Sequence, residues 1–310
     1  MSAIYILVAV TIDDAAMVDS SIDEPSASET EWVSGGTYVE GDVRIRTTSH
    51  RKYRAVDGHT GVTTLPEDDV ASVHWVDIGP TDRWAAFDIY VSTPSLGASP
   101  VTYVLHPGNF DGIWMGKLVG ETVTVQVLDE PAGAEIFPET VYTLVDPPLD
   151  WWDWAFGAYR SSDKLVLSGI PPSSTAELRI TIAGGTTCGA GMISIGDFRD
   201  LTAGLPDSGP LAGASAEPKT LSGITIADDG TLSIVRRRSG TDNRVEAVIA
   251  REASDYCLAT LQEVLDVPCA VVASRSPGYA GLNVFGLVSA SLVYLNAKRD
   301  LLTLTTKGIV

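Results

Sequence analysis

Short apolar runs recur along this chain, each bounded by glycine, proline, aspartate or serine, and this pattern constrains the fold most strongly. The runs are rich in Val, Ile, Leu and Thr, and several alternate apolar with polar residues, which is the period of a half-buried β-strand. The 29 glycines and 17 prolines supply frequent turn signals between them. We therefore expect strands at 3–11, 43–48, 122–128, 164–170, 176–184, 221–227, 230–237, 243–250 and 301–306.

One segment has helical rather than strand periodicity. In "SDYCLATLQEVLD", residues 254–266, four apolar residues recur at the spacing of a helix face: Leu258, Leu261, Val264 and Leu265. Ser254 or Asp255 is expected to cap its first turn. The sequence thus predicts a mostly β protein with one clear helix.

Changes in composition divide the chain into five segments. Residues 1–30 contain a strand and an acidic, serine-rich arm, and residues 31–80 form a small β module. Residues 81–203 have the strand spacing of a jelly-roll-like β-sandwich, since turn signals separate short strands. The small, mostly uncharged residues of 204–218 indicate a linker or long loop. Residues 219–310 are expected to form an α+β domain.

The charge balance disfavours a general nucleic-acid binder. Forty acidic residues against 21 basic ones give a net charge of −19, whereas phosphate binding requires clustered Lys and Arg. The single basic run, from Arg236 to Arg244, has no interleaved aromatic residues and is expected to be a solvated hairpin end. We expect no nucleic-acid partner.

The N-terminal apolar run lacks the preceding basic residues of a signal peptide and is too short for a membrane span. We therefore expect synthesis without export and no membrane embedding. Cys188, Cys257 and Cys269 are far apart and form no ligand pattern, so we expect buried free thiols rather than disulfides.

Motifs of common enzymes are missing from the sequence. It contains no G-x-S-x-G elbow, P-loop, G-x-G-x-x-G after a strand, or H-E-x-x-H. The four histidines, at 50, 59, 74 and 106, are scattered, and none has a His or Cys partner at metal-ligand spacing. Paired carboxylates such as Asp68–Asp69 are expected in solvated turns of so acidic a chain. We predict no catalytic site, metal or cofactor.

Spaced aromatic residues mark the small module. A module of about 50 residues has little hydrophobic core to stabilise it. The aromatic residues are candidates to supply that core, and Gly41-Asp42 is expected to form the hairpin turn that sets the strand register. Their order resembles that of the chitin- and cellulose-binding modules of carbohydrate-binding families 5 and 12. The matching pieces are Trp32, Tyr38, Gly41-Asp42-Val43, Tyr53, Pro66 and Trp75.

That resemblance implies glycan stacking on Trp32, Tyr38, Tyr53 and Trp75. The family, however, has an exposed aromatic residue in the loop after the second tyrosine, and here this loop, residues 55–73, has none. It carries three consecutive acidic residues, Glu67 to Asp69, instead. We therefore expect the four aromatic residues to be the module's core first, with sugar binding as an alternative.

A second aromatic cluster, Trp151, Trp152 and Trp154, follows Pro-Pro in "PPLDWWDWAF". On a strand, Trp152 and Trp154 would share one face and Trp151 would face the other way. Two interpretations stay open. Two of the tryptophans cover the open end of the sandwich core, which we favour, or the cluster is a stacking platform or an interface anchor.

A longer pattern resembles a group of virion proteins of tailed bacteriophages and prophages. In that group a carbohydrate-module-like segment leads into W-x-x-x-G-x-T-[ND]-R-W-x-x-F-D and then a β-sandwich with a tryptophan-rich segment and an "IGDF" strand. The matching residues here are Trp75, Gly79, Thr81, Asp82, Arg83, Trp84, Phe87, Asp88 and 195–198.

This resemblance implies a structural tail or baseplate component in the virion, in contact with other tail proteins and with copies of itself, and in reach of a host surface glycan. Asp82 and Arg83 would hold the module against the sandwich, because "GPTDRW" is too short for a free linker. A free carbohydrate-binding protein of lectin type is the alternative, and an unrecognised glycoside hydrolase or esterase is a third hypothesis.

Overall fold

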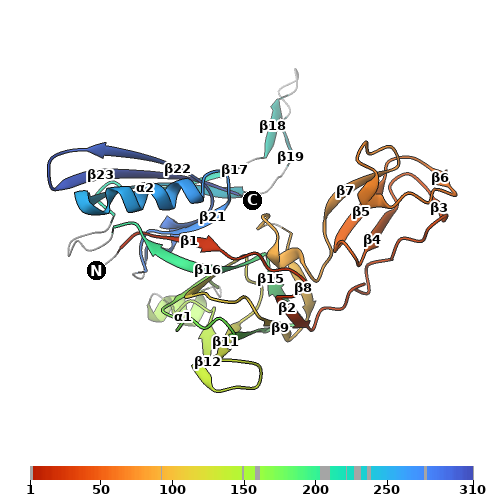
Figure 1. The fold of residues 1–310 in the computed structure, drawn as a ribbon, viewed down its shortest axis with the longest axis horizontal. Helices are drawn as coiled ribbons and strands as arrows, with labels where there is room; N and C mark the ends of the chain where they lie inside the picture. Colours follow the sequence, from red (N-terminus) through yellow and green to blue (C-terminus); the bar gives the residue numbers. More distant parts are fainter. Residues whose placement is uncertain are drawn as a thin grey trace.

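The computed structural model describes residues 3–91, 93–148, 150–157, 161–202, 210–220, 222–226, 232–235, 239–275 and 278–309. The protein is mostly β, as the sequence predicts, with several sheets and one longer helix. Figure 1 shows a small module of strands β3 to β7 standing to one side of a larger body. The larger body contains two main sheets.

The first main sheet has nine strands, and each neighbouring pair in it is antiparallel. It draws strands from the beginning, middle and end of the chain. In spatial order they are β13 (Lys164–Ser168), β10 (Gly112–Gly116), β16 (Met192–Asp200), β1 (Tyr5–Ala9), β21 (Cys269–Val272), β22 (Asn283–Tyr294), β23 (Arg299–Gly308), β20 (Ser239–Ala250) and β17 (Ser215–Thr220).

Strand β1 lies in the middle of this sheet, between β16 and β21, and pairs with both. The N-terminal strand is therefore not part of a separate arm: it joins the expected sandwich segment to the expected C-terminal segment. β17 also occupies the last four residues of the expected linker, 204–218, whose residues 204–209 lie outside the described residues. The same holds for Arg236 to 238 of the basic run; the rest of that run belongs to β20.

The second main sheet has five strands and forms a β-sandwich with one end of the first. Alternate residues of its strands point into the shared core, as in the buried positions Tyr103, Val125 and Ile180. Ile113 and Ile195 meet them from the nine-stranded sheet. The expected sandwich is thus present. Its strands are β12 (Glu135–Thr143), β11 (Thr122–Leu128), β14 (Glu177–Ala183), β9 (Val101–Leu105) and β2 (Met17–Ser20), with β8 (Ser95–Ala98) and β15 (Thr187–Ala190) as an added pair.

The other end of the nine-stranded sheet is covered by helix α2 (Ser254–Glu263), as Figure 1 shows. Cys257 and Leu261 on the helix pack into the same core as Ile6, Ala247 and Leu302 from the strands. The expected helix is confirmed, but it begins after Ala253 without a side-chain cap. Ser254 instead donates to the buried carboxylate of Asp300 at 2.5 Å.

The small module consists of a three-stranded and a two-stranded sheet. The former contains β4 (Val43–Arg46), β5 (Arg51–Ala55) and β7 (Trp75–Pro80), and the latter β3 (Thr37–Tyr38) and β6 (His59–Thr60). Gly41, with φ of +91°, and Asp42 connect β3 to β4, which belong to different sheets. The prediction that they form a register-setting hairpin turn is wrong: the turn at 47–50 joins the paired strands β4 and β5.

Shorter elements complete the chain. A hairpin of β18 (Gly223–Ile226) and β19 (Leu232–Val235) projects from the larger body in Figure 1. The remaining helices are α1 (Trp151–Phe156) and the single turns η1 (Pro66–Asp68), η2 (Ala85–Phe87), η3 (Arg251–Ala253) and η4 (Ala280–Leu282).

Asp82 connects the small module to the larger body. Its carboxylate accepts hydrogen bonds from Lys52 of β5 and from the hydroxyls of Ser26 and Ser28, at 2.5 and 2.9 Å for the two serines. Its backbone carbonyl accepts from the hydroxyl of Ser95 in β8. This residue therefore lies at the module junction, as expected. Arg83 makes a different contact, from Nε to the sulfur of Met17 at 3.5 Å.

Candidate interaction site

The tryptophan cluster forms a short helix, α1, and not a strand. Asp150 caps it, because its carboxylate accepts from the backbone N–H of Asp153 at 2.8 Å. The helix ends at Gly157, whose N–H donates to the carbonyl of Asp153. The strand prediction for Trp151, Trp152 and Trp154 is therefore wrong: the segment is a helix whose first turn is capped by Asp150.

All four large aromatic side chains of α1 are exposed to solvent. The exposed fractions are 72% for Trp151, 59% for Trp152, 77% for Trp154 and 69% for Phe156, and no residue of the helix is buried. The favoured interpretation, in which two tryptophans cover the end of the sandwich core, is therefore also wrong. The open alternative, a stacking platform or an interface anchor, is compatible with this exposure.

The exposed rings contact one another at steep angles. Trp151 and Trp152 meet edge to face, with ring centroids 5.7 Å apart and planes at 82°. Trp152 also lies against Phe156, one helical turn further on, at 4.5 Å and 43°. The cluster is thus an uneven apolar surface with inclined rings, and not a flat platform of parallel rings.

The aromatic residues of the small module have the opposite environment. Trp32, Tyr38, Tyr53 and Trp75 are each 6% exposed or less and form one core cluster with Ala55. Tyr38 packs edge-on against Trp75 at 4.9 Å, and its hydroxyl hydrogen-bonds both the N–H and the carbonyl of Val33 at 2.8 Å. Their ring faces are consequently covered by neighbouring side chains and are not free to stack on a sugar.

The fold brings together side chains that the sequence did not connect. Asp57, His59 and His74 each place one possible ligand atom within 4.8 Å of the other two. The expectation of scattered histidines thus missed a cluster in the small module. Only the D-x-H spacing of the first pair is visible in the sequence, since His74 lies 15 residues after His59, immediately before β7.

Buried thiols have little nucleophilic character here. All three cysteines are buried and free. Burial raises the pKa of Cys257 to about 11 and that of Cys269 to about 12, so both are overwhelmingly protonated at neutral pH. This agrees with the expectation of buried free thiols.

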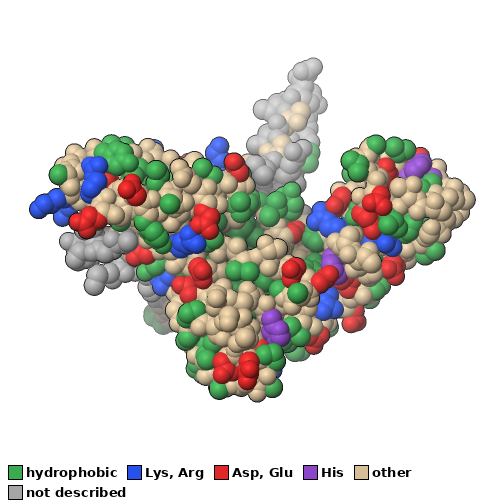
Figure 2. Space-filling view, viewed as in Figure 1, with side chains coloured by type: hydrophobic (Ala, Val, Ile, Leu, Met, Phe, Trp, Pro, Cys, Tyr) green, Lys and Arg blue, Asp and Glu red, His purple; other side chains and the backbone are tan. Residues whose placement is uncertain are grey.

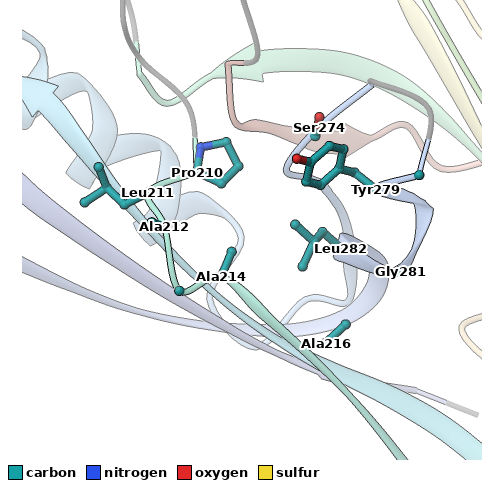
Figure 3. Close-up of a pocket in the computed structure, with 11 residues that line it drawn as sticks. Pro210, Leu211, Ala212, Ala214, Ala216, Ser274, Tyr279, Gly281 and Leu282 are labelled. Carbon is teal, nitrogen blue, oxygen red and sulfur yellow. The ribbon is translucent and has the colours of Figure 1, made fainter.

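A pocket of about 600 Å³ lies beside η4 (Figure 3). Pro210, Leu211 and Ala214 line one side, and Tyr279 and Leu282 the other. No charged side chain is among the described residues that line it, so it offers no acid–base pair.

The face shown in Figure 2 carries Lys and Arg side chains scattered among acidic ones, without a continuous basic patch. Within the part of the chain that the structure describes, no helix has the length and apolar character needed to cross a membrane.

Comparison with known proteins gives little support for a family. No protein-family model matches the chain, and no curated protein matches it. One solved structure is similar, the F5/8 type C domain of a Bacteroides fragilis protein, with 12% identity and a TM-score of 0.26. The match covers 52% of this chain and 98% of that one. A likeness this loose carries no argument about function.

Proposed function

We propose that this protein is a non-catalytic structural subunit of a phage tail or baseplate, built into the particle by protein–protein contacts. The observation that carries the proposal is the exposure of four large aromatic side chains on one capped six-residue helix. A soluble chain rarely leaves such a contiguous apolar surface uncovered unless another molecule covers it.

The energetics of α1 favour a protein partner. Burial of an aromatic side chain removes roughly 150–250 Å² from water, and Trp is enriched among residues that dominate interface affinity. Because Trp151 and Trp152 stand nearly perpendicular, a shaped apolar pocket would enclose them better than a flat sugar ring would. The helix is therefore suited to insert into a groove.

Charge indicates what surrounds that groove. Asp150 and Asp153 flank the tryptophans, and the whole chain carries a net charge of −19. A partner with an apolar groove rimmed by Lys or Arg would complement both features, and like charges would discourage acidic partners.

The particle class comes from the sequence pattern. Residues 75–88 resemble the segment that joins a carbohydrate-module-like unit to a sandwich in phage virion proteins, and Asp82 makes contacts at that junction. In this proposal the protein is made in the host cytoplasm and resides in the virion. Its partners are other tail proteins, copies of itself and, at the adsorption end, host-surface glycan.

The proposal is tested by quantitative mass spectrometry of purified particles from the genome that encodes the chain. We expect a fixed copy number that is a multiple of the tail symmetry, with antibody labelling at the tail in electron micrographs. Absence of the chain from infectious particles would overturn the proposal.

A second candidate function is carbohydrate binding at α1 rather than at the module core. It is favoured by the exposed tryptophan faces next to two carboxylates, a combination that binds sugars by stacking and hydrogen bonds. Glycan-array binding that disappears in Trp154→Ala, with the fold intact, would support it over assembly. Binding to no glycan on the array would eliminate it.

A further inference from the structure

Asp57, His59 and His74 come from two stretches of the small module that lie 15 residues apart in the sequence. Asp57 follows β5, His59 begins β6, and His74 immediately precedes β7. One carboxylate oxygen, Oδ1 of Asp57, lies 3.1 Å from Nδ1 of His59 and 3.0 Å from Nδ1 of His74. Two imidazoles and a carboxylate therefore converge on a single point.

These separations are close to those between ligands of a small metal ion. Zinc binds nitrogen and oxygen ligands at about 2.0–2.2 Å, so neighbouring ligands of a tetrahedral site are roughly 3.3–3.5 Å apart. The distances from Asp57 Oδ1 to the two Nδ1 atoms are shorter by a few tenths of an ångström, a difference that small side-chain rotations can supply. A metal ion would separate the three groups slightly without rearranging the backbone.

The surrounding structure fixes the side chain of His59. His59 is 9% exposed and packs among aromatic rings, edge-on to Trp75 with centroids 5.1 Å apart. Its Nε2 is buried without a hydrogen-bond partner among the described residues. Nδ1 is therefore the ring nitrogen that makes the polar contact, with Asp57. An imidazole that packing holds in one orientation, with one nitrogen facing the Asp57 carboxylate, is preorganised for coordination.

Asp69 positions the third ligand. Its carboxylate accepts from the backbone N–H groups of Val73, His74 and Trp75 at 3.0, 2.7 and 2.8 Å. These three hydrogen bonds anchor the backbone from which His74 projects.

From this convergence we infer that Asp57, His59 and His74 bind one divalent transition-metal ion, with zinc as the best fit. Two imidazoles and one carboxylate suit Zn²⁺ and its neighbours, whereas Ca²⁺ and Mg²⁺ prefer sites made of oxygen alone. The side chains of His74 and Asp57 are 30% and 49% exposed, so the remaining coordination position faces solvent.

Such an ion would stabilise the small module, whose hydrophobic core is small. The module's described core cluster is five buried side chains, all three cysteines lie elsewhere in the chain, and very small domains commonly need a metal or disulfide. The ligands would join the loop after β5 to β6 and β7. This inference does not depend on the proposed assembly function.

The test uses the full chain, stripped of metal by a chelator and titrated with Zn²⁺ in a calorimeter. We expect one Zn²⁺ per chain and a rise in melting temperature on binding. Removal of a group that only hydrogen-bonds to a metal ligand typically costs 10–100-fold in metal affinity, so Asp57→Asn and His74→Gln, which remove ligands, should each weaken Zn²⁺ binding by at least ~100-fold. Both positions are partly exposed, so these variants should fold.

His106→Gln is the matched control, because His106 lies near Glu177 of the sandwich and far in sequence from the cluster. It should retain one Zn²⁺ with unchanged affinity. Co²⁺ in place of Zn²⁺ should give the strong visible absorption of a low-coordinate site in the wild type and not in Asp57→Asn. Absence of stoichiometric Zn²⁺ binding to the wild type, or equal binding by folded Asp57→Asn and His74→Gln variants, would overturn the inference.

Discussion

Replacement of Asp82 by alanine should destabilise the junction between the small module and the larger body. The carboxylate accepts one charge-assisted bond from Lys52 and two hydroxyl bonds from Ser26 and Ser28. Hydrogen bonds to charged groups contribute roughly 1.5–3 kcal/mol each when buried. The Asp82 side chain is 28% exposed and Lys52 keeps Glu29 at 3.1 Å, so we expect a total loss of about 2–4 kcal/mol.

The same site should make stability depend on pH. Burial raises the pKa of Asp82, but the bonds from Lys52, Ser26 and Ser28 outweigh it and leave the pKa below the ordinary value of 3.8. The stabilisation is therefore complete above pH ~4 and is lost as pH falls through the lowered pKa of the folded state. Asp82→Asn should flatten this acid dependence.

Thermal unfolding followed by tryptophan fluorescence measures both effects. A loss of 2–4 kcal/mol should lower the Tm of Asp82→Ala by about 4–10 °C. Asp77→Ala is the matched control, because Asp77 pairs with Arg51 on the exposed surface of the same module, and such pairs contribute ~0–1 kcal/mol. An Asp82→Ala variant with the Tm of the wild type would refute the junction argument.

Three further outcomes follow from burial. Trp75→Ala should cost about 3–5 kcal/mol in urea unfolding, because the side chain is 1% exposed, and a cost below ~1 kcal/mol would contradict its place in the module core. Cys257 and Cys269, with raised pKa values, should react with Ellman's reagent at pH 8 only after denaturation; rapid labelling of the native chain would be inconsistent with this environment. Trp154→Ala should change the free energy of unfolding of the isolated chain by no more than ~0.5 kcal/mol, and a larger loss would mean that the ring packs internally.

Local patterns predicted several strands and the longer helix. Alternation at positions such as Val123 and Val125 predicted buried strand faces, and the spacing of Leu258 and Leu261 predicted α2. The central position of β1 was not predictable in this way, since its partners β16 and β21 lie about 190 and 260 residues further along the chain. Such pairing depends on long-range contacts that no local window contains.

The candidate sites likewise depend partly on local sequence signals and partly on long-range contacts. Three alternating residues are too few to distinguish a strand from a helix, and the decisive signal at Trp151 was Asp150 at the cap with Asp153 three residues later. The convergence of His59 and His74 required the positions of β6 and β7, which the spacing of 15 residues does not reveal.

Incorporation of variant chains into particles tests the assembly account most directly. Particles lacking the chain would be complemented with wild type, with a variant in which Trp151, Trp152 and Trp154 are all alanine, or with Tyr256→Ala, a control at a 47% exposed aromatic residue of α2. Since single interface anchors contribute 2 kcal/mol or more, incorporation of the triple variant should fall at least ~30-fold while Tyr256→Ala remains at the wild-type copy number. Incorporation of the folded triple variant at the wild-type copy number would contradict the account.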